Sequence, residues 1–450
     1  MIVVKRLARR IAPRSMLDSW SGWDEQRSFD RHVAAWEMAK STARRFATKW
    51  PPRRVLLVPA DPRTLVGSRG EEAMIAVFAQ TVLAAMPDAI ITVLTQTEEA
   101  SLAAEARGYV PLRLWGRPDF VPAITEMLAQ QRPDAVMVLG ADVLDGHYGA
   151  RGAAKMLIVA DLAARCGIPS TVLGFSFNNA PSPALKPIFD NLHDDVVINL
   201  RDPISLERFR AFTRAKPTLV ADTAFLMPPE PSPAHDNDVR FVEERRAAGQ
   251  AVVAVNLHPT LFKGRPATDL TDFVERMAEA MAMVSASRPV TWILLPHDFR
   301  ENEGDGIVLN AVGDVLRQKY PNTEFHAVQG VHSAPAIKAF GHHLDGVVAG
   351  RMHLTIGCLG GGVPVMALIY QDKFEGLYRH FDLPSWLLLD PHAATLEFAQ
   401  AIQRFVDELP ALRAQILRML PQVIADAHAN YAGLAEPQLD QEGIGAPVAA

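Results

Sequence analysis

Three charged or titratable side chains stand at the ends of apolar segments in the last third of the chain. Arg351 and His353 come just after the apolar run 347–350, which is bounded by glycine as a buried strand would be, and the small and apolar residues that follow favour a helix. Lys373 lies just beyond a second apolar run, 363–370. A strand-to-helix turn directs backbone N–H groups and the helix dipole at an anion, and an arginine there adds a bidentate contact for phosphate or carboxylate. The pattern therefore predicts an anion-binding site.

Two further strand ends carry polar side chains. His297 and Asp298 follow the apolar run 291–295, and His258 follows the run 252–257. Ligands bind at the carboxyl edge of open α/β sheets, where such residues would supply a second acid or base or would contact substrate hydroxyls. Capping of the strand ends is an equally good interpretation of these residues.

The first half of the chain contains three more candidates. Arg201 directly follows the apolar run 196–200, but its neighbour Asp202 could make it one half of a surface ion pair. Glu71 and Glu72 stand at the start of a helical pattern. They could bind substrate hydroxyls, or they could be acids in the first turn of a helix, where the dipole favours negative charge.

No group of candidate ligands predicts a metal site or a nucleotide cofactor. His342–His343 with Asp345, and His147 with two nearby aspartates, come nearest to a ligand set. Adjacent histidines on a helix point to different faces, however, and no spaced pair completes a tetrahedron. The turn at 67–70 lacks both the Lys-Ser/Thr of a P-loop and the full dinucleotide pattern. We therefore expect no metal, ATP or NAD.

The order of these motifs resembles the C-terminal signature of the polysaccharide pyruvyl transferase family. In that signature an Arg-x-His step, a small-residue helix, a Val-Pro strand and a Tyr-x-x-Lys ending follow one another, as they do here from Arg351 to Lys373. Three other segments are similar to family motifs, namely Arg-Asp-x-x-Ser at 201–205, Asp-x-Ala-Phe at 222–225 and Pro-His-Asp at 296–298. The resemblance covers roughly residues 54 to 390.

Two segments of the first half depart from the family pattern. Residues 68–73 read Ser-Arg-Gly-Glu-Glu-Ala where family members have Asn-x-Gly-Asp-x-Ala, so the acid is kept but its side chain is longer. Residues 139–142 read Leu-Gly-Ala-Asp where the family has a run of glycines. We expect acceptor binding to differ accordingly, with Glu71, Glu72 and Asp142 as the candidates on the acceptor side.

The resemblance implies a transferase that uses phosphoenolpyruvate as its donor substrate and needs no cofactor. It would transfer the enolpyruvyl group to a sugar of a cell-surface polysaccharide or exopolysaccharide, or of its lipid-linked precursor, and form a pyruvate ketal. By motif position, Arg201, Arg351 and Lys373 would bind the phosphate and carboxylate of the donor, and Arg351 and His353 would be the catalytic residues. His353 would act first as the acid and then as the base, because the unperturbed pKa of histidine is near neutrality.

Two other functions fit a two-domain α/β protein. A glycosyltransferase with a nucleotide-sugar donor would use the same kind of cleft. It would need an acidic pair to hold the ribose, and none is evident near residues 363–373. A non-catalytic saccharide-binding relative would be favoured if Arg351 or His353 were missing, but both are present.

Apolar, strand-like runs alternate with helical patterns along the chain, which predicts parallel α/β sheets. A polar, Pro-rich segment separates two such series and indicates a domain linker. The family resemblance implies two Rossmann-like domains that face a cleft, in a GT-B-like arrangement, with C-terminal helices packing back on the body. The expected divisions are a helical extension at 1–50, an acceptor-side domain at 51–226, the linker at 227–238, a donor-side domain at 239–390, helices at 391–436 and a disordered tail at 437–450.

The composition is that of an ordinary globular protein. Of 450 residues, 49% are hydrophobic and 21% charged, so the chain can bury two sizeable cores. A formal charge of −6 argues against a nucleic-acid partner, and the two cysteines, in apolar surroundings, predict reduced core thiols. No signal peptide or long apolar span is evident, which predicts a cytoplasmic protein.

The N-terminal segment 1–14 complicates this location. Val4, Leu7 and Ile11 share a helical face, while lysines and arginines occupy the rest of the segment. Peripheral contact with the inner face of an anionic membrane is one prediction. A basic tail that frays or packs on the body is the other.

Overall fold

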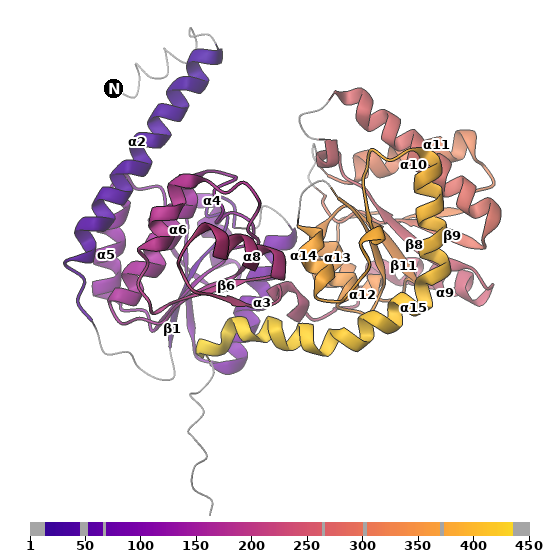
Figure 1. Ribbon diagram of the computed structural model, residues 1–450. Helices are drawn as coiled ribbons and strands as arrows, with labels where there is room; N and C mark the ends of the chain where they lie inside the picture. The colour runs from indigo at the N-terminus through magenta and orange to yellow at the C-terminus, as the bar shows by residue number, and fades with distance from the viewer. Residues whose placement is uncertain are drawn as a thin grey trace, which may run out of the picture.

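Two parallel β-sheets, each enclosed by helices, form the two halves of the protein (Figure 1). The two-domain α/β architecture predicted from the alternating patterns is confirmed. The computed structural model describes residues 14–45, 53–65, 69–262, 266–299, 304–369 and 373–434.

The first sheet has the strand order β3-β2-β1-β4-β5-β6-β7, and its neighbouring strands are parallel. The order reverses between β1 and β4, which is the place where open α/β sheets bind ligands. The strands are β1 (Arg54–Val58), β2 (Ile90–Leu94), β3 (Val110–Leu112), β4 (Ala135–Val138), β5 (Ser170–Phe175), β6 (Val196–Leu200) and β7 (Pro217–Leu219). The helices of this half are α2 (Arg14–Lys40), α3 (Arg69–Ala85), α4 (Glu98–Glu105), α5 (Phe120–Gln131), α6 (Ala150–Arg165), α7 (Lys186–Asp190) and α8 (Pro203–Phe212), with 3₁₀ turns η1 (Pro183–Leu185) and η2 (Thr223–Leu226).

The second sheet has the order β10-β9-β8-β11-β12-β13 and is also parallel, with its reversal between β8 and β11. Its strands are β8 (Ala251–Asn256), β9 (Val290–Leu294), β10 (Phe325–Ala327), β11 (Gly346–Ala349), β12 (Val365–Leu368) and β13 (Leu388–Leu389). Its helices are α9 (Asp236–Ala247), α10 (Ala267–Ser287), α11 (Gly306–Lys319), α12 (Ala334–Gly341), α13 (Met352–Leu359), α14 (Phe374–Arg379) and α15 (Thr395–His428), with 3₁₀ turns η3 (Pro233–His235), η4 (Pro259–Phe262), η5 (Ser385–Leu387) and η6 (Ala429–Leu434).

The central strands are covered on both faces, which explains why they are continuous apolar runs rather than alternating ones. In β1, Val55 and Leu57 join one hydrophobic cluster with residues of α3 and α4. Leu56 and Val58 join another with residues of α5 and α6. The cluster under α3 and α4 continues into the core of the second domain, so the two domains share apolar packing.

The short edge strands β3, β7, β10 and β13 were not predicted from the sequence. Each has three residues or fewer and is partly exposed, so its composition carries little apolar signal. The runs 196–200, 252–257, 291–295 and 347–350 fall within one residue of the buried strands β6, β8, β9 and β11 at both ends, whereas the run 363–370 extends two residues beyond β12 at each end.

The connection between the domains runs from η2 through the segment 227–238. The last three residues of this predicted linker already belong to α9, and η3 lies inside it. The long helix α15 then returns from the second domain toward the first (Figure 1). Pro410 and Pro421 lie inside this helix without ending it. The exact domain boundaries stay a prediction.

Helix α2 lies along the outer side of the first domain, away from the second (Figure 1). Within the described residues, no helix is both long and apolar enough to cross a membrane. The basic segment 1–13 and the predicted tail 437–450 lie outside the described residues, so the predictions made for them stay predictions. Cys166 and Cys358 are buried and form no disulfide.

Asn430, in the turn that follows α15, fastens the end of the chain to the first domain. Its Oδ1 accepts a hydrogen bond from the Gly174 amide at 2.6 Å, and its Nδ2 donates to the carbonyls of Ala221 and Ala427 at 2.9 Å each. The side chain is buried. One amide therefore ties β5, the β7–η2 connection and α15 together.

We predict that Asn430→Ala lowers the free energy of unfolding by about 2–3 kcal/mol, because it leaves buried backbone groups of β5 and of the β7–η2 connection without partners. Urea denaturation followed by circular dichroism measures this loss. Gln422→Ala, an exposed change in α15, is the matched control and should not shift the transition. Equal stability of Asn430→Ala and the wild type would contradict the anchoring role.

Candidate active site

The Arg351 guanidinium is held by two carboxylates at the carboxyl edge of the second sheet. Asp305 is fully buried, and its Oδ1 accepts hydrogen bonds from Nε and Nη2 of Arg351 at 2.9 and 2.7 Å. A second carboxylate oxygen, Oδ2 of Asp298, lies 3.2 Å from the same Nη2. Arg351 is therefore neutralised from the side of its own domain.

Asp305 also organises the loop that follows β9. Its Oδ2 accepts hydrogen bonds from the backbone amides of His297 and Asp298 at 2.9 and 3.1 Å and from Nδ2 of Asn256 at 2.8 Å. Sequence reasoning missed Asp305, because an aspartate one residue before a helix is typical of an ordinary N-cap. It makes no such cap bond here.

His258 supports the turn that carries Arg351. Its Nε2 donates to the Gly350 carbonyl at 2.9 Å, and its Nδ1 accepts from the Thr260 hydroxyl at 2.6 Å. Burial lowers the pKa of His258 to about 4, and the charge of Arg351 acts in the same direction. A Cβ at position 350 would lie only 2.8 Å from the imidazole, so the close approach requires glycine there.

His297 also stays neutral near pH 7. Burial is the main cause that lowers its pKa to about 4, and His353 and Arg351 act in the same direction against Asp305 and Asp298. Asp298 is paired with Arg351, and the two histidines near Arg351, His258 and His297, are both uncharged at pH 7. The ring contacts of His258 show strand-end support, whereas for His297 it is the backbone amide that Asp305 binds. An acid–base role for either residue stays a prediction.

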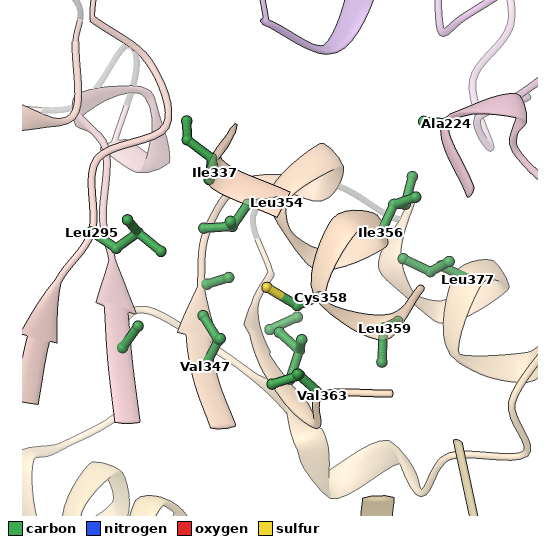
Figure 2. Packing of buried hydrophobic residues seen from close by; sticks show 14 of the residues in the cluster. Ala224, Leu295, Ile337, Val347, Leu354, Ile356, Cys358, Leu359, Val363 and Leu377 are labelled. Atoms are coloured by element: carbon green, nitrogen blue, oxygen red, sulfur yellow. The ribbon is translucent and has the colours of Figure 1, made fainter. Parts of the chain in front are cut away.

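Apolar packing fixes helix α13, which carries His353 in its first turn. Leu354 and Cys358 point toward the strand that bears Val347, and Ile356 points the other way, toward Leu377 (Figure 2). The helix is thereby held between the second sheet and elements nearer the first domain.

His353 reaches from this helix to the first domain. A Cβ at Gly70, in the first turn of α3, would lie 2.0 Å from its Nδ1, so the imidazole packs directly on that glycine. Its buried Nε2 has no hydrogen-bond partner among the described residues. Burial lowers the pKa of His353, and the charges of Arg201 and Lys373 add to this effect against the opposing Asp222 and Asp142.

Arg201 is buried at the contact between the domains. Its Nη1 donates to Asp222 at 2.7 Å, its Nε donates to the Ser176 hydroxyl at 2.7 Å, and its Nη2 lies 3.3 Å from the sulfur of Met352 in α13. The surface pair with Asp202, which was the alternative interpretation of Arg201, does not form, because Asp202 caps α8 through Ser205. Arg201 and the second domain are therefore in direct contact.

Lys373 forms an ion pair with Asp142, which follows β4 in the other domain. Burial alone would raise the pKa of Asp142, but Lys373 holds it below the ordinary value. A pocket of about 210 Å³ opens beside this pair. Its lining comprises Asp142, Asp145, His147, Tyr148, Ser176, Phe177, Asn178, Asn179, Ala180, Ser205, Arg208 and Lys373.

The two acids of α3 have different environments. Glu71 is buried, its Oε1 accepts a hydrogen bond from the Asp61 amide at 2.5 Å, and burial raises its pKa to about 8 with help from Asp61 and Asp142. Glu72 pairs with Arg107 at 3.1 Å in a partly exposed position. Only Glu71 is thus electrostatically linked to the site around Asp142.

The structure gathers most of the predicted residues into two adjoining groups. Around the domain contact it brings together Arg201, His353, Lys373, Asp142 and, through the charge of Asp142, Glu71. Behind Arg351 lie His258, His297 and Asp298. Glu72 belongs to neither group. In the part of the chain that the structure describes, no group of three or more His, Cys, Asp or Glu side chains is arranged to hold a metal ion.

The family model of the polysaccharide pyruvyl transferases matches residues 31–372. This chain belongs to that family. The match includes all the predicted site residues except Lys373, which directly follows its end. A comparison with curated proteins gave no match.

Solved structures with the same fold have different activities and little sequence identity. A protein named as a UDP-N-acetylglucosamine 2-epimerase from Listeria monocytogenes has a TM-score of 0.55 at 12% identity, covering 85% of this chain and 97% of its own. Another UDP-N-acetylglucosamine 2-epimerase gives 0.52 at 12%, over 88% and 99%. A glycosyltransferase from Rickettsia africae gives 0.51 at 10%, over 85% and 99%. At these identities the likeness establishes the GT-B fold and nothing more about this pyruvyl transferase family member.

We predict that Asp305→Asn destabilises the second domain by about 3 kcal/mol, because it leaves Arg351 without its main buried counter-charge. Urea denaturation, followed by the fluorescence of the tryptophans, measures the loss. Asp314→Asn removes an exposed carboxylate from α11, the helix that follows Asp305, and should leave the transition where it is. If both variants unfold alike, Asp305 does not organise this edge of the sheet.

We predict that Glu71 makes the protein less stable as pH rises. Its folded-state pKa of about 8 exceeds the reference value of 4.5, so the folded state keeps a proton that the unfolded state has lost between these values. The contribution of this proton to the free energy of unfolding is complete below about pH 4.5 and is lost by about pH 8. Between these values the free energy of unfolding falls by roughly 1.4 kcal/mol per pH unit.

Glu71→Gln imitates the protonated side chain and tests this linkage. Its stability relative to the wild type should increase between pH 5 and pH 9 in urea denaturation experiments. Glu72→Gln, at the neighbouring and partly exposed position, should show no such trend. A difference between Glu71→Gln and the wild type that does not change with pH would show that Glu71 is ionised in the folded protein.

Proposed function

We propose that this protein transfers the enolpyruvyl group of phosphoenolpyruvate to two hydroxyls of one sugar. In the balanced reaction, two C–O bonds form at the central carbon of the donor and its C–O bond to phosphate breaks. One hydroxyl proton ends on the methylene carbon, which becomes a methyl group, and the other leaves with inorganic phosphate. The product is a pyruvate ketal on a cell-surface polysaccharide or exopolysaccharide, or on a lipid-linked precursor, made in the cytoplasm.

The observation that carries this proposal is the position of His353 between cations from both domains. Its buried Nε2 lacks a protein partner among the described residues, and Arg201 and Lys373 are close enough to lower its pKa. A buried polar atom without a hydrogen-bond partner costs free energy. A hydrogen bond between this atom and a substrate atom is therefore favourable. Arg201 and Lys373 supply N–H donors and a local positive field for a donor that carries a phosphate and a carboxylate, and Arg351 lies in the adjoining group.

The lowered pKa of His353 bears on how it acts as an acid. In the absence of donor, His353 is neutral at pH 7 and can only accept a proton. A bound donor brings several negative charges next to the imidazole, and opposite charges at close range raise the pKa of histidine. Donor binding would thus favour protonation of His353. The imidazolium would then donate this proton to the methylene carbon, and the neutral imidazole would accept a hydroxyl proton.

Glu71 is a second source of this proton, since its carboxyl group is protonated near neutrality. It adjoins Gly70, on which His353 packs. Burial and the neighbouring Asp142 together keep its proton in place.

The pocket beside Asp142 is the proposed acceptor site. Asp145 shapes it, because its two oxygens accept hydrogen bonds from the His147 amide at 2.8 Å and from Nδ2 of Asn178 at 2.6 Å. This joins the loop after β4 to the loop after β5. Tyr148 is exposed beside it and offers a ring for stacking on a sugar. A saccharide acceptor suits such a mixture of aromatic, amide and carboxylate groups.

A glycosyltransferase with a nucleotide-sugar donor is the alternative, because a glycosyltransferase of solved structure shares the fold. The membership in the pyruvyl transferase family favours phosphoenolpyruvate instead.

We predict that calorimetry detects saturable binding of phosphoenolpyruvate by the wild type and that Lys373→Met weakens this binding at least about tenfold, since one cation of the donor site is lost. Arg201→Ala should also weaken it. Arg379→Met, which removes an exposed cation from helix α14 just beyond Lys373, is the control and should bind the donor as the wild type does.

A panel of nucleotide sugars is titrated in parallel. If a nucleotide sugar binds and phosphoenolpyruvate does not, the protein is a glycosyltransferase and the proposal is wrong. If Arg201→Ala binds the donor as tightly as the wild type, Arg201 is not part of the donor site.

A further inference from the structure

The cations at the proposed donor site are all paired with carboxylates, but the pairs differ in how easily a ligand can replace the carboxylate. In the Arg201–Asp222 pair the side chains are 3% and 2% exposed, and in the Arg351–Asp305 pair they are 16% and 0% exposed. In the Lys373–Asp142 pair they are 17% and 30% exposed. The aspartates of the first two pairs are buried without access to water, whereas Asp142 borders an open pocket. Among these three pairs, Lys373–Asp142 is the one that a ligand can open.

We infer that the carboxylate of Asp142 occupies, on Lys373, the place of an anionic group of the donor, and that donor binding displaces Asp142 into the adjoining pocket. This inference rests on the proposed function. The two groups carry the same negative charge and make the same contact with an ammonium ion, so they compete for it directly. Asp142 is thus an internal competitor of the donor.

Backbone geometry holds Asp142 in this place. It follows Ala141, whose φ of +46° lies in the left-handed region that a non-glycine residue adopts at a cost. The Ala141 carbonyl accepts a hydrogen bond from the Ser176 amide at 2.9 Å, which fixes the turn after β4. The sequence resemblance places a run of glycines at this turn in the family. The competing carboxylate is therefore a feature of this chain and not of the family's sequence pattern.

The displaced carboxylate would face the proposed acceptor. Asp142 already lines the pocket together with Tyr148 and Asn178, and a carboxylate freed from Lys373 can accept a hydrogen bond from a sugar hydroxyl. Because Asp142 is released only when an anion takes Lys373, the donor would bind first and the acceptor second. The Lys373–Asp142 ion pair also joins the two domains. A donor that replaces Asp142 on Lys373 would therefore replace this contact between the domains.

The test measures donor affinity in variants that lack the competing carboxylate. Asp142→Asn and Asp142→Ala should each bind phosphoenolpyruvate about three- to tenfold more tightly than the wild type in calorimetric titrations, as expected when a partly buried ion pair no longer has to be broken. This result is distinctive, since loss of an ordinary binding residue weakens affinity. Inorganic phosphate and pyruvate are titrated separately. The one that binds the Asp142 variants more tightly than the wild type corresponds to the group of the donor that takes the place of Asp142.

Glu207→Gln is the matched control, because Glu207 pairs with Arg379 across the same two domains at 3.2 Å but does not line the pocket. It should leave the affinity unchanged. Melting temperatures of all variants show that they are folded. Unchanged or weaker binding of phosphoenolpyruvate, phosphate and pyruvate by both folded Asp142 variants overturns the inference. If the wild type does not bind phosphoenolpyruvate, the proposed function fails, and the phosphate and pyruvate titrations still decide whether Asp142 competes for Lys373.

Discussion

The charge of Arg201 is buried where the two domains meet, and much of the surrounding structure serves to make that burial tolerable. A guanidinium that is 3% exposed needs a counter-charge and hydrogen-bond acceptors for its N–H groups. Asp222 supplies the charge and Ser176 the hydroxyl, while the sulfur of Met352 comes from the other domain. The β5, β6 and β7 ends must therefore converge on one point, and α13 must lie against it.

This requirement links helix α13 to the first domain without a permanent salt bridge between them. Met352 offers Arg201 a soft, neutral contact, and His353 packs on the bare backbone of Gly70. His380 of the second domain donates to the Arg201 carbonyl at 2.9 Å, and Asn430 fastens α15 on the far side of the same contact. These neutral contacts and the exposed Arg379–Glu207 pair hold the domains together, and Lys373–Asp142 is the partly exposed charged contact within the site.

The sequence predicted the buried strands and the residues that follow them, because continuous apolar runs and their polar ends are local features. It could not predict which charges would pair. Arg201 has Asp202 as its neighbour in sequence, yet it pairs with Asp222, which the fold brings in from beyond β7. Asp305 resembles a helix cap and becomes the centre of the β9 loop only once Arg351 lies over it. Such partners depend on the register of whole elements, which no local pattern encodes.

Paired cations have a consequence for selectivity. A site with several bare positive charges would attract any anion, whereas here Arg201 and Arg351 are each balanced by a buried aspartate. They contribute oriented N–H groups and local field rather than net charge. His353 is neutral until an anion arrives, because burial and the neighbouring cations lower its pKa. In the proposed mechanism, a ligand must carry enough negative charge both to replace a carboxylate on Lys373 and to raise the pKa of His353 until it is protonated. A donor with a phosphate and a carboxylate meets both demands, whereas a monoanion meets only one.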